Sequence, residues 1–160
     1  MSKRHFILAA IALAALAGCA STPQPVTVAD TLAARPQLST LNGLIVKAGL
    51  TDTLKGAGPF TVFAPTNEAF AKVPAKTMQA LASDPVRLKA VLTYHVLPAK
   101  VMLADVKNGN SKTVNGASLA LSRAGDFVTV EEALVQTSDI SATNGVVHTV
   151  DSVLLPPASR

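Results

Sequence analysis

Hydrophobic residues recur at steps of three and four residues in two segments of the first hundred positions, which is the spacing of one face of an α-helix. The first segment is helical from Asp30 and stops at Gly49. The second opens at Asp84-Pro85, which suit the cap and the first turn of a helix. We expect it to end near Thr93, with Tyr94–Leu97 already extended. The inward faces carry Leu38, Leu41, Leu44, Ile45 and Ala48 in the first helix, and Leu88, Val91, Leu92 and His95 in the second.

A short strand and a helix start lie between these two helices. Phe60–Ala64 combines aromatic and β-branched residues between two prolines, which is typical of a strand. Thr66 is a suitable N-terminal cap for a short helix that Pro74 ends, with Phe70 and Val73 facing inward.

The polar residues at this junction fit two interpretations. In the first, Thr66, Asn67 and the distant Asp139 brace the fold, with Asn67 bonded to a neighbouring segment such as the loop near Asp139. Buried polar groups of this kind need partners, and losing one costs about 1–3 kcal/mol. In the second, the same side chains contact a ligand directly.

After Pro98 the hydrophobic period shortens to that of strands. Glycine-containing pairs such as Asn115-Gly116 and Asn144-Gly145 mark tight turns between them. Helices first and strands mostly after indicate an α+β plan. The expected strands are Lys112–Val114, Ser118–Ser122, Phe127–Val130, Ala133–Gln136, Asp139–Ala142 and Val146–Val150.

The N-terminus resembles a bacterial lipoprotein signal. Two basic residues precede the twelve-residue apolar run Phe6–Ala17, which is too short for a comfortable membrane span. Leu16-Ala17-Gly18-Cys19 resembles a lipobox, in which cleavage leaves Cys19 lipidated at the new N-terminus. The alternatives are a free thiol after ordinary cleavage and an uncleaved anchor. Ala20, where some lipoproteins carry a retaining Asp, resembles the pattern sorted to the outer membrane.

Composition limits the partners of the mature chain. Residues 1–18 form the predicted signal peptide, residues 19–27 the lipidated Cys and a proline-containing tether, and residues 28–157 one domain. Removing the signal takes away two basic residues and no acidic one, which leaves twelve basic and ten acidic residues and a net charge of +2. A net charge this small does not indicate a nucleic-acid-binding protein. Nothing suggests a coiled coil, so we expect a monomer.

Three ordered segments resemble the signatures of the fasciclin-domain family. Phe60–Phe70 resembles the first signature, Tyr94-His95 the central Tyr-His pair, and Asn144–Pro156 the second signature. The resemblance implies a wedge-shaped β-sandwich of short strands surrounded by helices. It also implies a role in adhesion or extracellular recognition.

The family's cell-binding segments match two places in this chain. The Tyr-His segment corresponds to Tyr94-His95, and an Asp-Ile segment shortly before the second signature corresponds to Asp139-Ile140. These four residues are therefore the candidate interaction residues that the resemblance implies. Thr66, Asn67, Phe70 and His148 are the candidate structural residues of the two signatures.

The residue types argue against catalysis. Only His95 and His148 remain after signal removal, whereas a zinc ion usually takes three or four protein ligands. A histidine among apolar neighbours is either a hydrogen-bonded core residue or a general base, and we favour the core. On a strand, Glu131-Glu132 would point to opposite faces and be solvated. We therefore expect no catalytic residues, no metal and no cofactor.

Two functions remain open, with an unrecognised hydrolase as a distant third. The first is an exported, lipid-anchored binding or adhesion module of the bacterial envelope, held at the outer membrane and facing the periplasm or the cell surface, with an unknown protein or glycan ligand. The second is a periplasmic factor that binds a small ligand or assists envelope assembly. Accessibility to an external antibody distinguishes them.

Overall fold

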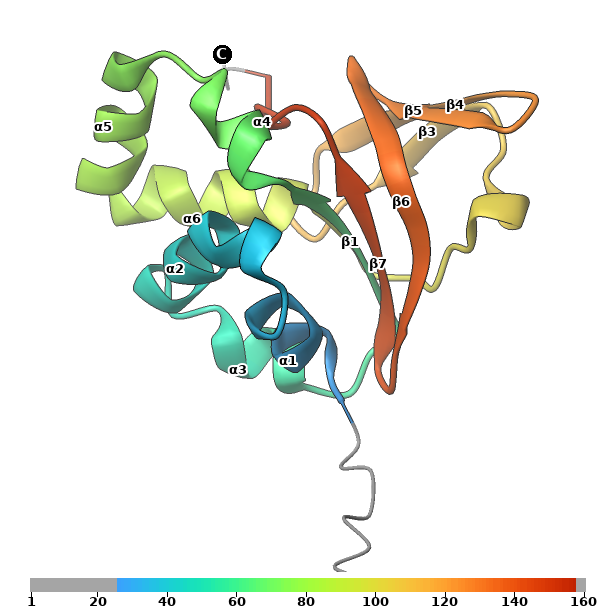
Figure 1. The fold of residues 1–160 in the computed structure, drawn as a ribbon, viewed down its shortest axis with the longest axis horizontal. Helices are drawn as coiled ribbons and strands as arrows, with labels where there is room; N and C mark the ends of the chain where they lie inside the picture. The colour runs from blue at the N-terminus through green and yellow to red at the C-terminus, as the bar shows by residue number, and fades with distance from the viewer. Residues whose placement is uncertain (1–25, 158–160) are drawn as a thin grey trace, which may run out of the picture.

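Within residues 26–157, helices predominate before Val96 and strands predominate from Gly109 onward, as the change in hydrophobic period predicts. The computed structural model describes residues 26–157, and Figure 1 shows the helices gathered beside a bent sheet. The helices are α1 (Val28–Ala33), α2 (Ser39–Lys47), α3 (Thr51–Lys55), α4 (Asn67–Ala71), α5 (Ala75–Ser83) and α6 (Pro85–Tyr94), with 3₁₀ turns η1 (Pro36–Leu38) and η2 (Leu103–Asp105). The strands are β1 (Phe60–Pro65), β2 (Val96–Leu97), β3 (Gly109–Lys112), β4 (Ser118–Ala124), β5 (Phe127–Val130), β6 (Ala133–Ala142) and β7 (Gly145–Val150).

Side-chain caps begin three of the helices. At α1, the Thr27 hydroxyl accepts from the N–H of Asp30 and the Asp30 carboxylate accepts from the N–H of Thr27, which is a capping box. At α4, the Thr66 hydroxyl accepts from the N–H of Ala69 at 3.3 Å. At α6, the Asp84 carboxylate accepts from two N–H groups of the first turn. The predicted caps Thr66 and Asp84 are thus confirmed, and each satisfies N–H groups that a helix start leaves free.

The seven strands of residues 26–157 form one sheet in the order β2-β1-β7-β6-β5-β4-β3. Only β1 and β7 are parallel, and the other neighbours are antiparallel. The two ends of the sheet approach one another: Val114, beyond β3, donates its N–H to the carbonyl of Val96 in β2 at 2.8 Å. The sheet is therefore nearly closed, in keeping with the expected fasciclin-type α+β fold.

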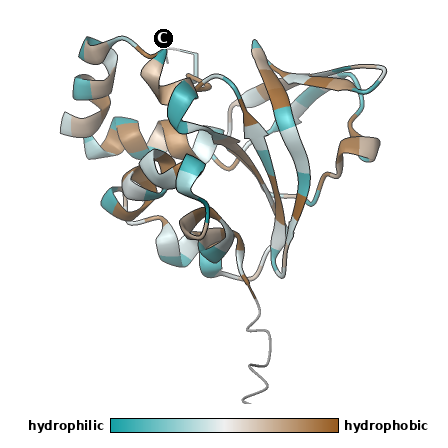
Figure 2. Cartoon of the chain, in the orientation of Figure 1, coloured by the Kyte–Doolittle hydropathy of each residue, from teal (hydrophilic) through white to brown (hydrophobic). Residues whose placement is uncertain are grey.

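Two hydrophobic cores lie on opposite faces of the central strands. In β1, Val62 and Ala64 belong to the core beneath the helices, whereas Phe63 belongs to the core inside the bent sheet. This alternation follows from the two-residue period of a strand. In Figure 2 hydrophobic and hydrophilic residues are interspersed along the helices, as expected for elements with one buried face.

The structure differs from the predicted helices in four respects. The single helix expected from Asp30 to Gly49 is divided into α1, η1 and α2, because Arg35, directly before Pro36, has an extended backbone that ends α1. The structure adds α3 and α5, neither of which the hydrophobic spacing indicated. Helix α1 begins at Val28 rather than Asp30, because Thr27 caps it. Helix α6 runs through Tyr94, with His95 still in a helical conformation, so the extended segment begins at Val96.

The strands differ as well. The first strand of the predicted hairpin is Gly109–Lys112 rather than Lys112–Val114, because Thr113 turns the chain and bonds to the carbonyl of Ala117. The two strands expected within residues 133–142 are one strand, β6, with irregular pairing to β7. Glu131-Glu132 form the turn between β5 and β6 and do not lie on a strand.

Candidate functional site

The Tyr94-His95 pair ends α6 inside the molecule, and each residue is only 2% exposed. The Tyr94 hydroxyl lies 3.1 Å from the carbonyl oxygen of Ser118 and 3.1 Å from a carboxylate oxygen of Glu131. Burial, together with this carboxylate, raises the pKa of Tyr94 to about 12. The same Glu131 oxygen accepts from the N–H of Ala120 at 2.8 Å. Glu131 is therefore a bonded turn residue and not merely a solvated one.

His95 bonds through both ring nitrogens. Its Nδ1 lies 2.8 Å from the carbonyl oxygen of Val91, and its Nε2 accepts from the N–H of Leu154 at 3.0 Å. A proton on Nδ1 and a free lone pair on Nε2 satisfy both contacts, so the ring is neutral. Burial lowers the pKa of His95 to about 4. The core interpretation of this histidine is confirmed, and neither His95 nor Tyr94 offers surface for a direct contact.

Asp139-Ile140 lies at an irregularity of β6. Asp139 has a left-handed backbone with φ of 56°, which is uncommon for a residue other than glycine. Its carboxylate accepts from the N–H of Leu103 at 2.8 Å, and its own N–H donates to Nδ1 of His148 at 3.1 Å. Ile140 is half-buried against the first core. Both candidate interaction residues are thus partly exposed and firmly held.

His148 connects β7 to a distant loop. Its Nε2 lies 2.8 Å from the carbonyl oxygen of Val101, and its ring stacks on Phe63 with centroids 5.6 Å apart. Burial lowers the pKa of His148, while the Val101 carbonyl and the charge of Asp139 oppose that shift. A neutral ring with its proton on Nε2 satisfies both partners. The predicted structural role of His148 is consistent with these contacts.

Three side chains from adjacent strands fasten the loop that crosses the sheet after β2. Thr61 in β1 donates its hydroxyl to the carbonyl of Ala99 at 2.6 Å and accepts from the N–H of Val101 at 2.8 Å. His148 in β7 and Asp139 in β6 bind the next residues of the same loop. We call Thr61, Asp139 and His148 the crossover clamp. It joins one of the candidate interaction residues to the central strands.

Asn67 braces the fold through a segment other than the expected one. Its Oδ1 accepts from the N–H of Thr40 at 3.0 Å, and its Nδ2 donates to the carbonyl of Pro36 at 3.0 Å and to Ser39 Oγ at 3.1 Å. The expected bond to the loop near Asp139 is wrong, because that loop is held by the crossover clamp. Asn67 instead ties α4 to the start of α2, while Phe70 is buried in the first core.

Asn144 is a structural residue that the sequence did not reveal. Its Oδ1 accepts from the N–H of Val28 at 2.8 Å, and its Nδ2 donates to the carbonyls of Leu54 at 2.7 Å and Gly56 at 2.8 Å. The Asn-Gly pair indicated only a tight turn between β6 and β7. That turn exists, but the side chain also joins the ends of α1 and α3, and no local pattern signals such remote partners.

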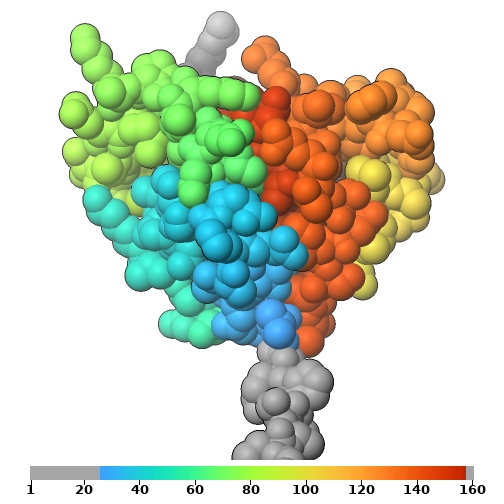
Figure 3. Space-filling view, in the orientation of Figure 1, coloured from blue at the N-terminus to red at the C-terminus, as the bar shows by residue number. Residues whose placement is uncertain are grey.

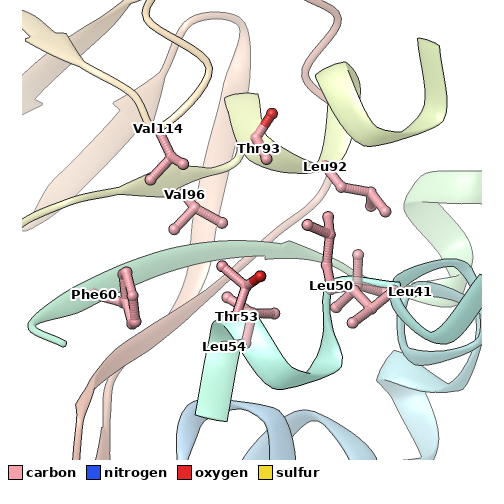
Figure 4. Close-up of a pocket in the computed structure, with 10 residues that line it drawn as sticks. Leu41, Leu50, Thr53, Leu54, Phe60, Leu92, Thr93, Val96 and Val114 are labelled. Atoms are coloured by element: carbon pink, nitrogen blue, oxygen red, sulfur yellow. The ribbon is translucent and has the colours of Figure 1, made fainter. Parts of the chain in front are cut away.

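An apolar crevice lies between α2, α3 and the edge of the sheet (Figure 4). Its cavity volume is about 20 Å³, which is room for roughly one water molecule. Leucine and valine side chains point into it from both sides, and Val114 closes it at the end of the sheet. The space is a packing defect of the first core and too small for a ligand as it stands.

The described residues contain no group of three or more histidine, cysteine, aspartate or glutamate side chains close enough to hold a metal ion. No helix within residues 26–157 is long and apolar enough to cross a membrane. Cys19 and the predicted signal lie outside the described residues. Side-chain hydrogen bonds thus hold the loops of the domain against its strands and helices. Such bonds keep the surface that these loops form in a fixed shape.

The fold and these bonded signature residues define a fasciclin domain. The fasciclin domain family matches residues 36–156, and the chain belongs to that family.

Similar proteins come from several organisms. The chain is 39% identical over 140 residues to the protein sll1483 of Synechocystis sp., covering 86% of this chain and 78% of that protein. It is 37% identical over 148 residues to the cell surface glycolipoprotein MPB83 of Mycobacterium bovis, covering 89% and 64%. It is 40% identical to the transforming growth factor-beta-induced protein ig-h3 of Sus scrofa over 87% of this chain but only 20% of that protein.

A solved structure shares the fold. A pair of such domains from the insect cell adhesion molecule fasciclin I superposes with a TM-score of 0.64 at 19% identity, covering 81% of this chain and 51% of that chain. At this identity the likeness shows the fold alone.

Proposed function

We propose that this chain is an exported, lipid-anchored binding or adhesion module of a bacterial cell envelope that acts as a monomer and without catalysis. The observation that carries the proposal is the segment Leu16–Cys19, which resembles a lipobox and precedes one fasciclin domain. The similarity to a cell surface glycolipoprotein supports the anchor, and the similarity in fold to a cell adhesion molecule supports the role.

The predicted tether enters the domain at one end, which leaves the opposite end free to meet a partner. The carbonyl of Val26 accepts from the N–H of Thr143 at 2.9 Å, so the chain joins the domain beside the turn between β6 and β7. Figure 1 shows α5 and the C-terminal end of the described chain at the opposite end of the molecule. A tether of about ten residues at roughly 3 Å each would hold the domain some 30 Å from a bilayer. Its far end then faces away from the membrane.

The candidate interaction residues divide into two kinds under this proposal. Asp139 and Ile140 are partly exposed and would contact a partner directly. Tyr94 and His95 are buried and would support the surface from within, because they fix the turn at Glu131 and the segment at Leu154. A binding defect in a Tyr94 or His95 variant should therefore come with a loss of stability.

Fractionation of cells tests the anchor. Cys19→Ser removes the thiol to which lipid is attached and should move the protein from the membrane to the soluble fraction. Ser21→Ala, two residues along the same tether, is the matched control and should remain with the membrane. A Cys19→Ser protein that stays in the membrane fraction would overturn lipid anchoring.

Antibody labelling tests the side of the envelope. Labelling of intact cells supports adhesion at the surface, while labelling only after permeabilisation supports the periplasmic alternative. A cytoplasmic enzyme of equal abundance serves as the control for leakage. Both outcomes are informative, because the proposed outer-membrane anchor is compatible with either side of that membrane.

A further inference from the structure

A polar cleft of about 420 Å³ lies where η1, α4, β6 and β7 meet. It is lined by Gln37 of η1, Thr66–Glu68 at the start of α4, Gln136-Thr137 of β6 and the buried Thr149 of β7. In Figure 3 these surfaces meet on the face shown, where the cyan and green regions border the orange-red one. The volume falls within the range of about 300–1,000 Å³ found for ligand clefts.

A bulge in β6 turns two consecutive side chains into this cleft. Val135 pairs with Val150 and Thr137 pairs with Thr149, so Gln136 is an extra residue on the β6 side. In a regular strand neighbouring side chains point to opposite faces, yet Gln136 and Thr137 both line the cleft. Bulges re-aim side chains in this way and are frequent beside functional sites.

Hydrogen bonds hold both walls of the cleft in place. The bulge displaces the N–H of Thr137 from the regular ladder, and the hydroxyl of the buried Thr149 accepts from it at 3.0 Å. On the other wall, the Asn67 amide bonds the carbonyl of Pro36 and fixes η1, which carries Gln37, against α4. The cleft is therefore preformed, and a ligand need not order it.

The groups that remain for a ligand are almost all neutral and polar. Gln37, Glu68 and Gln136 are exposed, and their side chains make no hydrogen bond or ion pair to other residues of the described domain. With the hydroxyl of Thr137 they supply two carboxamides, one carboxylate and one hydroxyl, which offer both donors and acceptors. No lysine or arginine lines the cleft to hold a phosphate, and no large apolar side chain lines it to anchor a peptide.

We propose that this cleft binds a neutral saccharide. Vicinal hydroxyl groups both donate and accept, so they match carboxamide and carboxylate side chains that converge from three elements. The proposal rests on the proposed function, because it gives this binding module a saccharide site in addition to the Asp139-Ile140 surface, which does not line the cleft. Gln37, Glu68 and Gln136 contact the sugar hydroxyls, and Thr149 and Asn67 position the walls.

A neutral-glycan array probed with the purified full chain tests the cleft. The protein is kept in lauryldimethylamine oxide, because detergents with sugar head groups would compete. The strongest binder is then titrated by calorimetry against Gln37→Ala, Gln136→Ala and Glu68→Gln. Each lost hydrogen bond should weaken binding by about tenfold, at unchanged melting temperature. The matched controls are Gln79→Ala on α5 and Glu132→Gln on the β5–β6 turn, which should bind like the parent.

Two results would overturn the inference. One is a folded protein that binds no neutral glycan on the array. The other is glycan binding that the Gln37→Ala/Gln136→Ala double variant leaves unchanged, since the sugar then lies elsewhere. Neither result bears on the proposed function. Lipid anchoring is tested by fractionation of the Cys19→Ser protein, and surface exposure is tested by antibody labelling of intact cells. Conversely, cleft-dependent glycan binding together with an unreleased Cys19→Ser protein would contradict the anchor alone.

Discussion

The N–H of Asp139 in β6 donates to Nδ1 of His148 in β7 across 3.1 Å, so a residue with a left-handed backbone is fixed by the neighbouring strand. The other ring nitrogen of His148 lies 2.8 Å from the carbonyl of Val101. One neutral imidazole therefore joins the bulged strand, the central strand and the crossover loop. The partly exposed Asp139-Ile140 segment depends for its position on a buried histidine.

Replacing His148 with alanine should destabilise the domain by about 3 kcal/mol. The change leaves the N–H of Asp139 and the carbonyl of Val101 without their partner, at about 1–3 kcal/mol for each buried group. It also removes the ring that stacks on Phe63. Urea unfolding followed by circular dichroism measures the loss. Ser141→Ala, on the exposed side of the same strand pair, should change stability by less than about 0.5 kcal/mol, and a comparably small effect in His148→Ala would contradict the clamp.

The stability of the domain should fall as the pH drops from about 6.5 towards 4. Burial lowers the pKa of His95 to about 4, and it also lowers the pKa of His148. Between the folded and the unfolded pKa, the unfolded chain binds more protons than the folded one, so acid favours unfolding. For His95 alone the loss is on the order of 3 kcal/mol across this range.

Urea unfolding at intervals between pH 5 and 7 checks this dependence, in a range where most carboxylates remain ionised. Proton uptake on unfolding should approach one group from His95, with a further contribution from His148 that disappears in His148→Gln. A free energy of unfolding that stays constant over this range would show that neither histidine is held neutral by the fold.

Local patterns in the sequence were enough for several features of the fold. Helix caps at Thr66 and Asp84 depend on residues two or three positions away, so the sequence alone contains the whole interaction. The turn at Asn144-Gly145 and the β7 strand are likewise local. Helices α3 and α5 were missed because neither begins with a side-chain cap, which is the local signal that marks α4 and α6 in the sequence.

Long-range polar contacts could not be predicted. The partners of the Asn144 amide are 88 to 116 residues away, and those of the Asn67 amide are 27 to 31 residues away. The choice of partner depends on how the helices stack on the sheet, which no local pattern encodes. The two irregularities of β6 were hidden for the same reason, since a bulge is a property of the strand pair. The polar cleft at Gln136 was therefore invisible in the sequence.

Asn67→Ala should lower the free energy of unfolding by about 1–3 kcal/mol, because the change leaves the N–H of Thr40 and the carbonyl of Pro36 unpaired. Asn110→Ala is the matched control, since Asn110 is exposed on the edge strand β3 and its side chain makes no hydrogen bond within the described domain. Thermal unfolding followed by circular dichroism measures both variants. The melting temperature of Asn67→Ala should fall clearly, whereas any weakening of partner binding should be small. Weakened binding at full stability would instead make Asn67 a recognition residue.

Two glycines should respond in opposite directions to the same substitution. A Cβ on Gly145 would overlap the backbone carbonyl oxygen of Phe60 in the parallel neighbour β1. It would also lie only 3.0 Å from Cγ2 of Val28. The backbone cannot yield without separating β1 from β7, so Gly145→Ala should cost at least about 3 kcal/mol or prevent folding. A Cβ on Gly43, exposed in α2, meets no atom within 4 Å, and Gly43→Ala should stabilise the domain by about 0.5–1 kcal/mol.

Urea unfolding and soluble yield, measured side by side for the two glycine variants, check these signs. Gly43→Ala serves as the control for any general effect of adding a methyl group. A Gly145→Ala protein as stable as the parent would mean that β1 and β7 are not packed backbone to backbone at this point. Phe60 and Gly145 begin the strands that carry the two family signatures. That result would therefore contradict the pairing of β1 with β7 at the centre of the sheet.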